Sequence, residues 1–195
     1  MVGSLGARSI RSIELRGFRR SRRPFLDHPV MTVIATAAAR DAEAIGAVHL
    51  RSALTAYADI FPRSTPPPTS EQLTAQWQAM IGDPGARVLV ARGDGAIVGA
   101  VALEAAPTVP SGLLLVGLYV DPDHWGRGIG SMLHDAAVAD ARLRSDGLNL
   151  WVLEANLVAR AMYERRGWSL VPDRHLANEP PEIRDVLYQL DLTGC

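Results

Sequence analysis

Hydrophobic and polar residues follow two different periods along the chain, and these periods predict its helices and strands. In residues 41–57, apolar positions recur at near-helical spacing after the acids Asp41 and Glu43, which indicates a helix. Further helices are expected over residues 70–81, from about 128 to 144, and over 158–166. Runs rich in valine, isoleucine and leucine predict strands at residues 31–35, 87–92, 96–104, 113–120, 148–153, 168–171 and 183–192.

Turn residues separate these elements. Gly93-Asp94-Gly95 between two strands is a strong hairpin signal. Residues 61–69 contain four prolines and must form a loop, because proline lacks the N–H that a helix needs. The elements then run helix, helix, antiparallel meander, and strand–helix–strand–helix–strand. This order predicts one α/β domain of the α+β kind over residues 31–195, with a mixed sheet flanked by helices.

Composition narrows the class of protein. With 48% hydrophobic and 21% charged residues, a 195-residue chain can bury a sizeable core. No apolar run is long enough to cross a bilayer, so we expect a soluble, cytoplasmic protein without a membrane partner. The lone cysteine, Cys195, excludes an internal disulfide and a cysteine-based metal site, and we expect no metal. Lysine is absent from the chain, which excludes a P-loop nucleotide site.

The first thirty residues differ from the rest in charge. They hold seven arginines but only Glu14 and Asp27 as acids, so they carry +5 and the remainder carries −6. Strand-like sequence begins only at Met31, and we expect residues 1–30 to be an unfolded basic tail or an over-extended start. A nucleic-acid-binding arm and a transit peptide are the alternatives.

A glycine-rich loop follows the predicted strand that ends at Val120. Gly126, Gly128 and Gly130 lie where the backbone must turn into the next helix. Glycine lets peptide groups approach a bulky anion, and the first N–H groups of a helix have no partner within it. With the positive end of the helix dipole, these groups predict an anion site, typically for a pyrophosphate, to which Arg127 adds a charged contact.

Two alternatives compete for this loop. Three alternating glycines can simply form a flexible turn. A dinucleotide-binding turn would place its glycines directly after the strand, but residues 121–125 intervene and Ser131 stands where the third glycine belongs.

Two segments resemble the GNAT acetyltransferases. Residues 120–133 are similar to the family's coenzyme A pyrophosphate motif, Q/R-x-x-G-x-G/A, with Trp125 at the Q/R position. Residues 151–168 resemble its N-x-x-A-x-x-x-Y-x-x-x-G-[FW] segment. The resemblance covers residues 31–192 and implies the GNAT fold, whose mostly antiparallel sheet has two middle strands that splay apart around the pantetheine arm of acetyl-CoA.

The resemblance also implies which residues bind the cosubstrate. Leu118, Tyr119 and Val120 would offer backbone groups to pantetheine, and the N–H of Val120 would polarise the thioester carbonyl. The loop residues expected around the pyrophosphate are Trp125, Gly126, Arg127, Gly128, Ile129, Gly130 and Ser131. Asn156 would bond the pantetheine arm or cap the following helix. Arg160 would meet the adenosine 3′-phosphate or remain a solvated arginine.

For catalysis, the resemblance assigns Tyr163 as the acid that protonates the departing thiolate, the alternative being a packed helix residue. Relatives often place a glutamate on the strand before the glycine loop, but residues 113–118 contain no acid. Glu104 is therefore the candidate base, with a surface charge as its alternative. Tyr57 and Asp59, before the proline-rich loop, are candidates for binding the amine acceptor, or else a core residue and an exposed charge.

The sequence thus favours an enzyme that transfers acetyl from acetyl-CoA directly to a primary amine. The alternative is a module that binds acyl-CoA without turnover. The acceptor amine is not identified, a homodimer is compatible with the sequence, and nucleic acid is expected as a partner only through the basic tail.

Overall fold

The computed structural model describes residues 31–62, 64–177 and 183–194, so the expected basic tail lies outside the described residues. Within them, seven strands form one mixed sheet in the order β1-β2-β3-β4-β5-β7-β6. The strands are β1 (Val33–Thr36), β2 (Arg87–Gly93), β3 (Ala96–Ala105), β4 (Leu113–Val120), β5 (Gly147–Leu153), β6 (Ser169–Ala177) and β7 (Arg184–Asp191). Every neighbouring pair is antiparallel except β4 and β5, which are parallel. The predicted mixed sheet is confirmed.

Four α-helices and two short 3-10 helices accompany the sheet in the described part of the chain. They are η1 (Ala39–Asp41), α1 (Ala42–Ala56), α2 (Ser70–Gly82), η2 (Pro122–His124), α3 (Ile129–Ala141) and α4 (Leu157–Glu164). All four predicted helices are present, although α3 ends three residues earlier than expected. The strand predicted at residues 168–171 is longer than expected and continues to Ala177.

Local chemistry explains several boundaries. At the start of α2, Thr69 Oγ1 accepts a hydrogen bond from the Gln72 N–H, while Gln72 Oε1 accepts one from the Thr69 N–H. This reciprocal pair satisfies two donors that the helix leaves open. In the predicted hairpin, Asp94 and Gly95 have φ angles of 51° and 76°. Two positive φ angles in succession match the twist that a two-residue turn needs between antiparallel strands.

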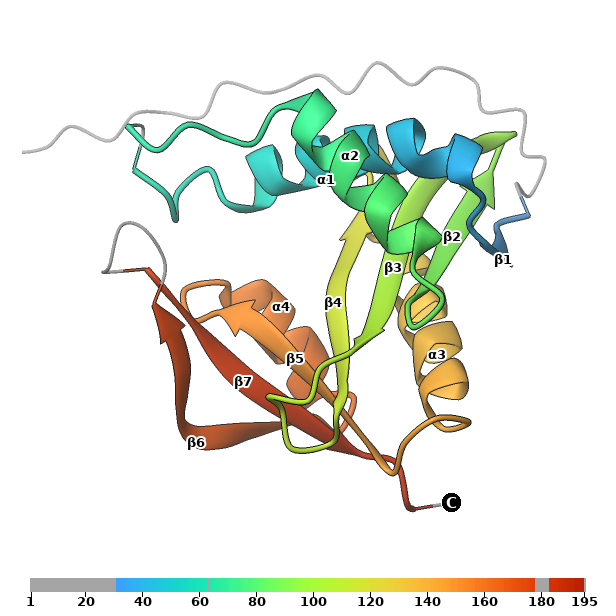
Figure 1. The fold of residues 1–195 in the computed structure, drawn as a ribbon. Helices are drawn as coiled ribbons and strands as arrows, with labels where there is room; N and C mark the ends of the chain where they lie inside the picture. Colours follow the sequence, from blue (N-terminus) through green and yellow to red (C-terminus); the bar gives the residue numbers. More distant parts are fainter. Residues whose placement is uncertain (1–30, 63, 178–182, 195) are drawn as a thin grey trace, which may run out of the picture.

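The sheet is covered on both faces, and β3 shows how one strand serves both. Ala100 and Ala102 belong to the cluster that packs under α1 and α2. Val101 and Leu103 belong to the cluster under α3 and α4. Successive side chains of a strand point to opposite faces, so a strand buried on both sides is apolar throughout. Figure 1 shows α1 and α2 on one face of the sheet and α3 on the other.

The parallel pair at the centre of the sheet is short. Only Leu114 with Asn149 and Leu115 with Leu150 pair between β4 and β5. Beyond Leu115 the two strands separate, and Figure 1 shows them diverging toward their carboxyl ends. The strand backbones beyond this point therefore face a gap in the middle of the sheet.

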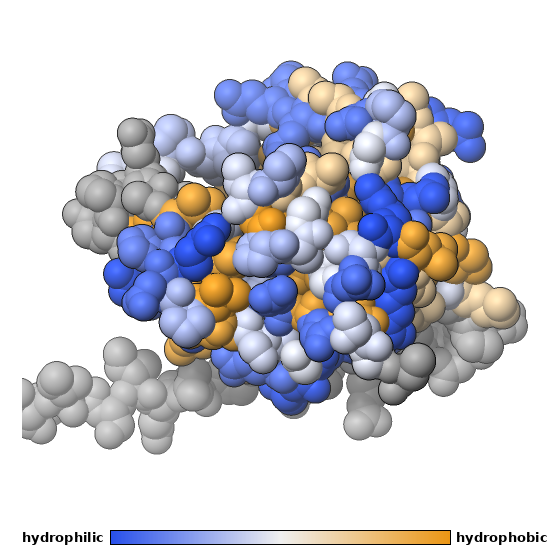
Figure 2. Space-filling view, turned by 60° about the horizontal axis from the view of Figure 1, so that its bottom comes forward, coloured by the Kyte–Doolittle hydropathy of each residue, from blue (hydrophilic) through white to orange (hydrophobic). Residues whose placement is uncertain are grey.

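No helix in the described part of the chain is long and apolar enough to cross a membrane. On the face that Figure 2 displays, hydrophobic side chains are interspersed among hydrophilic ones.

Candidate functional site

A cleft of about 330 Å³ opens where β4 and β5 separate. Its walls come from residues 115–119 of β4, residues 151–153 of β5, and side chains of α4 and β7. Tyr57 and Phe61, at and after the end of α1, close it on the other face of the sheet. The cleft thus runs through the sheet and is reached by residues from both helical layers.

The backbone of β4 presents hydrogen-bonding groups to this cleft. The N–H of Asp121 donates to the carbonyl oxygen of Val98 on β3 across 2.9 Å. Because the backbone groups of successive strand residues point to opposite edges, the N–H groups of Val120 and Leu118 face away from β3. The backbone of Tyr119 instead faces its partner Ala100 on β3. Of the three predicted backbone contacts, the geometry therefore favours Leu118 and Val120 but not Tyr119.

The glycine-rich loop leads from the end of β4 into α3. Gly126 and Gly128 have φ angles of 74° and 81°, a conformation that strains any residue with a Cβ. Residues 125–128 are exposed, whereas Ile129 is buried and anchors the first turn of α3. Gly128 is the N-cap, and no side chain of the described residues caps the helix start. The first amides of α3 thus point outward from an exposed, cap-free helix end.

Contacts within the loop hold its shape. The indole N–H of Trp125 donates to the carbonyl oxygen of Val120 across 2.7 Å. Asp121 forms an ion pair with Arg51 of α1, and its Oδ1 accepts the N–H of Asp123 at 3.0 Å. The Arg127 guanidinium donates to the carbonyl oxygen of Asp123 across 2.9 Å. These contacts therefore attach the loop to β4 and to α1 and define its conformation.

Three tyrosines line the cleft: Tyr57, Tyr119 and Tyr163. Tyr163 is 7% exposed, and its ring meets Trp168 with 5.6 Å between ring centroids. Burial, with a smaller effect of the neighbouring Tyr57, raises the pKa of Tyr163 well above its usual range. Burial likewise raises the pKa of Tyr119 and that of Tyr57. All three hydroxyl groups therefore keep their protons at neutral pH and can act as hydrogen-bond donors.

An aromatic cluster supports the α1 side of the cleft. The Tyr119 ring stacks on His49 with ring centroids 3.7 Å apart. His49 Nδ1 accepts a hydrogen bond from the Trp77 indole at 3.3 Å. Burial lowers the pKa of His49 to about 4, so its imidazole is neutral at physiological pH. These contacts fix the Tyr119 ring between α1 and the cleft.

Asn156 and Arg160 lie at the start of α4, and both make contacts within the protein. Asn156 caps α4, since its Oδ1 accepts the N–H of Ala159 at 3.2 Å, and it also lines the cleft. Arg160 donates to the Tyr188 hydroxyl at 3.1 Å and to the carbonyl oxygen of Glu154 at 3.0 Å. The capping alternative for Asn156 is thus present in the structure. The Arg160 guanidinium is held by hydrogen bonds to Tyr188 and Glu154 rather than freely solvated.

The structure places two of the predicted residues away from the cleft. Glu104 pairs with Leu114, at the end of β4 where β4 and β5 are still joined. Six strand steps, about 20 Å, separate Leu114 from Val120, whose N–H is the group expected at the thioester carbonyl. Asp59 is exposed in the turn after α1 and does not line the cleft. The geometry therefore does not support Glu104 as the base or Asp59 as the acceptor-binding residue, whereas Tyr57 does reach the cleft.

Sequence reasoning missed Asp185. It lies at the start of β7, opposite Leu153 of β5, and lines the cleft. Among the described residues that line the cleft, it is the one with a carboxylate. No local signal could have found it, because β7 lies between β5 and β6 rather than at the edge of the sheet. Elsewhere in the described ranges, no group of three histidine, cysteine or acidic side chains is arranged as a metal site.

Comparisons with known proteins agree with this architecture. A model of the acetyltransferase (GNAT) family matches residues 50–168, more than half of the chain. Mycothiol acetyltransferase of Beutenbergia cavernae is 36% identical over 80 residues, which are 40% of this chain. The chain spans only 26% of that relative's length.

Solved structures share the fold. The paiA N-acetyltransferase of Thermoplasma acidophilum, in complex with coenzyme A, has a TM-score of 0.62 and 18% identity over 83% of this chain and 99% of the other. The ribosomal-protein-alanine N-acetyltransferase of Brucella melitensis has a TM-score of 0.65 and 20% identity over 82% of this chain and 99% of the other. With its splayed central strands, glycine-rich helix start and matching family model, the chain belongs to the GNAT acetyltransferase family.

Proposed function

We propose that this protein is an acetyl-CoA-dependent N-acetyltransferase that moves an acetyl group to a primary amine by direct attack. One observation carries the proposal: Tyr163 lines the cleft between β4 and β5, and the exposed glycine-rich start of α3 lies beside the same end of β4. A thioester in this cleft would have its phosphates near the helix start and its reacting carbon between the strands.

The residues around the cleft fit such a ligand. The backbone amides from Gly126 to Ser131 suit a pyrophosphate, because they combine N–H donors that the helix leaves open with the positive end of a helix dipole. The N–H groups of Leu118 and Val120 suit the amide groups of a pantetheine arm lying along β4. Asn156, the N-cap of α4, lines the same cleft.

The reaction follows from these positions. The uncharged amine attacks the thioester carbonyl carbon, and a C–N bond forms as the C–S bond breaks. The N–H of Val120 would stabilise the negative charge that develops on the carbonyl oxygen. The Tyr163 hydroxyl would give its proton to the departing sulfur, and it regains one from the proton that the nitrogen releases. The products are an N-acetylated amine and free coenzyme A, with no net change in protons.

Direct attack is favoured over an acyl-enzyme route. The cleft-lining residues in the described part of the chain include no serine, threonine or cysteine that could act as the nucleophile. A covalent intermediate would need such a group beside a base. We therefore expect a ternary complex of protein, acetyl-CoA and amine before any bond breaks.

Two measurements on the full chain test the proposal. Isothermal titration calorimetry with acetyl-CoA should give saturable binding, and a free-thiol assay should show release of coenzyme A that depends on added amine. Binding without amine-dependent thiol release from any amine tested would favour a non-catalytic acyl-CoA module instead. Absence of acetyl-CoA binding would overturn both alternatives.

A further inference from the structure

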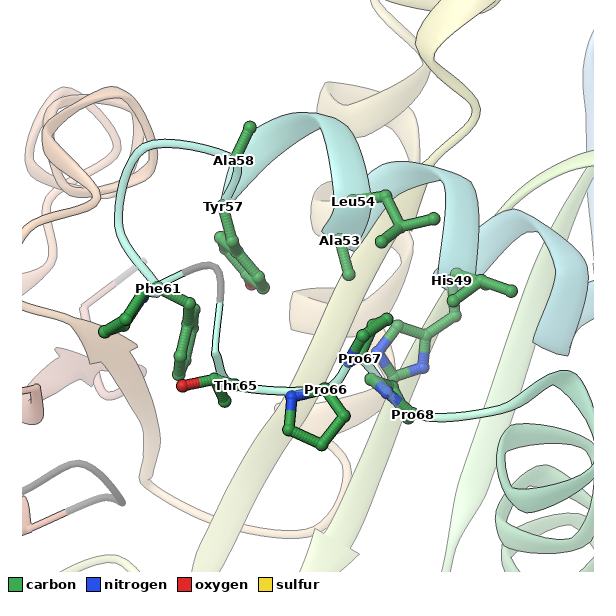
Figure 3. Close-up of a pocket in the computed structure, with 12 residues that line it drawn as sticks. His49, Ala53, Leu54, Tyr57, Ala58, Phe61, Thr65, Pro66, Pro67 and Pro68 are labelled. Carbon is green, nitrogen blue, oxygen red and sulfur yellow. The ribbon is translucent and has the colours of Figure 1, made fainter.

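A second cavity adjoins the cleft. It has a volume of about 340 Å³ and lies between the end of α1 and the proline-rich loop that follows it. Tyr57 and Phe61 line both the cavity and the cleft, so the two spaces meet at these rings. Figure 3 shows Tyr57 and Phe61 toward one end of this cavity and His49, Pro67 and Pro68 toward the other. We refer to it as the α1 pocket.

The α1 pocket is suited to an apolar group. Its remaining walls come from Ala53, Leu54 and Ala58 of α1 and its C-terminal turn, and from the prolines of the loop. Tyr57 and Phe61 face each other at a tilt of 55° with 6.1 Å between ring centroids. Because aromatic rings and prolines offer few hydrogen-bonding groups, a charged or strongly polar body would lose hydration here without compensation. An aryl or branched alkyl body has little hydration to lose and gains from the burial of its apolar surface.

Asp185 brings a carboxylate to the cleft, whose lining it shares with Tyr57 and Phe61, the two residues that also line the α1 pocket. Val186 and Tyr188 of β7 face the core under α3 and α4. Since side chains alternate along a strand, Asp185 faces the α1 side of the sheet. The cleft that Asp185 lines is also lined by Tyr57 and Tyr119. Asp185 and Tyr57 therefore border the same cleft, and Tyr57 also lines the α1 pocket.

We propose that the acceptor is a primary amine carried on an aryl or branched alkyl body, with the body in the α1 pocket and the ammonium group bound by Asp185. This inference rests on the proposed function and names its substrate class. The ammonium group first loses one proton to water. The neutral amine then attacks the thioester carbon from the α1 side, while Tyr163 donates its proton to the departing sulfur from the α4 side. A carboxylate next to the amine would lie against Asp185 and be repelled, and a second ammonium group would occupy the apolar pocket at a loss of hydration.

The test compares amines that differ in one feature. Phenethylamine has the aryl body and a single amine, L-phenylalanine adds a carboxylate beside the amine, and 1,4-diaminobutane replaces the ring by a second amine. A short peptide with a free N-terminal alanine represents protein acceptors. Calorimetry on the protein saturated with coenzyme A measures binding of each without turnover, and the thiol assay measures kcat/KM. We expect phenethylamine to exceed each of the other three about tenfold or more in both measurements.

Two variants locate the contacts. Asp185→Asn should weaken phenethylamine binding about tenfold and reduce the penalty against L-phenylalanine. Leu54→Gln alters the α1 pocket at a residue that is 50% exposed and should lower phenethylamine affinity severalfold, but not that of 1,4-diaminobutane. The matched control is Leu143→Gln, since Leu143 is 86% exposed and lies after α3, outside both spaces.

The outcomes separate this inference from the proposed function. The substrate class is wrong if coenzyme A binds but phenethylamine does not, or if the diamine or the peptide is acetylated as efficiently as phenethylamine. Neither result contradicts the proposed acetyltransferase activity. If Asp185→Asn binds phenethylamine as tightly as the unaltered chain, the ammonium contact is wrong. If acetyl-CoA itself does not bind, the proposed function fails first.

Discussion

The indole N–H of Trp125 donates to the carbonyl oxygen of Val120, with 2.7 Å between the two heavy atoms. This bond joins the glycine-rich loop to the end of β4, so it couples the expected pyrophosphate site to the strand edge that faces the cleft. Trp125 stands at the motif position where glutamine or arginine is usual in the GNAT acetyltransferases. Here the side chain at that position organises the backbone.

Replacing this donor tests the coupling. Trp125→Phe keeps an aromatic ring but removes the N–H, and we expect the affinity for acetyl-CoA to fall about three- to tenfold, as for the loss of one hydrogen bond. The melting temperature should change little, because Trp125 is 45% exposed. Calorimetric titration with acetyl-CoA measures the effect. An affinity within twofold of that of the unaltered chain would show that the loop keeps its shape without this bond.

The conformation of the loop gives a second prediction. Gly128→Ala introduces a Cβ at a φ angle of 81°, which costs about 1 kcal/mol or more of stability. It should also weaken acetyl-CoA binding, because the amides at the start of α3 would shift. Gly82→Ala is the matched control, since Gly82 ends α2 and a Cβ there meets nothing within 4 Å. Urea unfolding and calorimetry of both variants decide whether the effect is specific to the loop.

The proposed acid gives a third prediction. Tyr163→Phe removes the hydroxyl from the cleft and should lower kcat about a hundredfold or more, with little change in the KM for acetyl-CoA. Tyr188→Phe serves as the comparison, because the Tyr188 hydroxyl donates to Glu164 at 2.6 Å and Tyr188 is not among the residues that line the cleft. The Tyr188→Phe variant should have a lower free energy of unfolding but an unchanged kcat. A kcat for Tyr163→Phe within threefold of the unaltered value would remove this tyrosine from the proton transfer.

The pH dependence of stability gives a fourth prediction. Burial lowers the pKa of His49 from 6.5 to about 4, so its contribution to stability is complete above pH 6.5. As the pH falls from 6.5 toward 4, the unfolded state binds a proton that the folded state resists, and stability is lost. Between pH 7.5 and 5, the unaltered chain should lose about 2 kcal/mol more than His49→Phe.

Urea unfolding of both proteins at the two pH values provides the measurement. Burial also lowers the pKa of His134, but that residue is present in both proteins and cancels in the comparison. Equal losses for the two proteins would mean that His49 titrates normally in the folded state.

The sequence by itself determined the features that depend on neighbouring residues. The Asp94–Gly95 turn, the loop at residues 61–69 and the glycine-rich start of α3 each follow from conformations that the chain needs within a few positions. The resemblance to the GNAT motifs also pointed to Tyr163, and the structure places this residue in the lining of the cleft. The conformations of these turns and helix starts depend on neighbouring residues and little on the rest of the chain.

Only the tertiary structure decided where the acids lie. Glu104 was expected near the reacting centre because it ends a strand next to β4, but antiparallel pairing sets it against Leu114, at the joined end of the cleft. Asp185 was overlooked because β7 is inserted between β5 and β6, an order that no local pattern encodes. Strand order and the point of separation between β4 and β5 are set by packing of the sheet against helices on both faces. Such packing is a property of the whole fold, and it governs which distant side chains share a cleft.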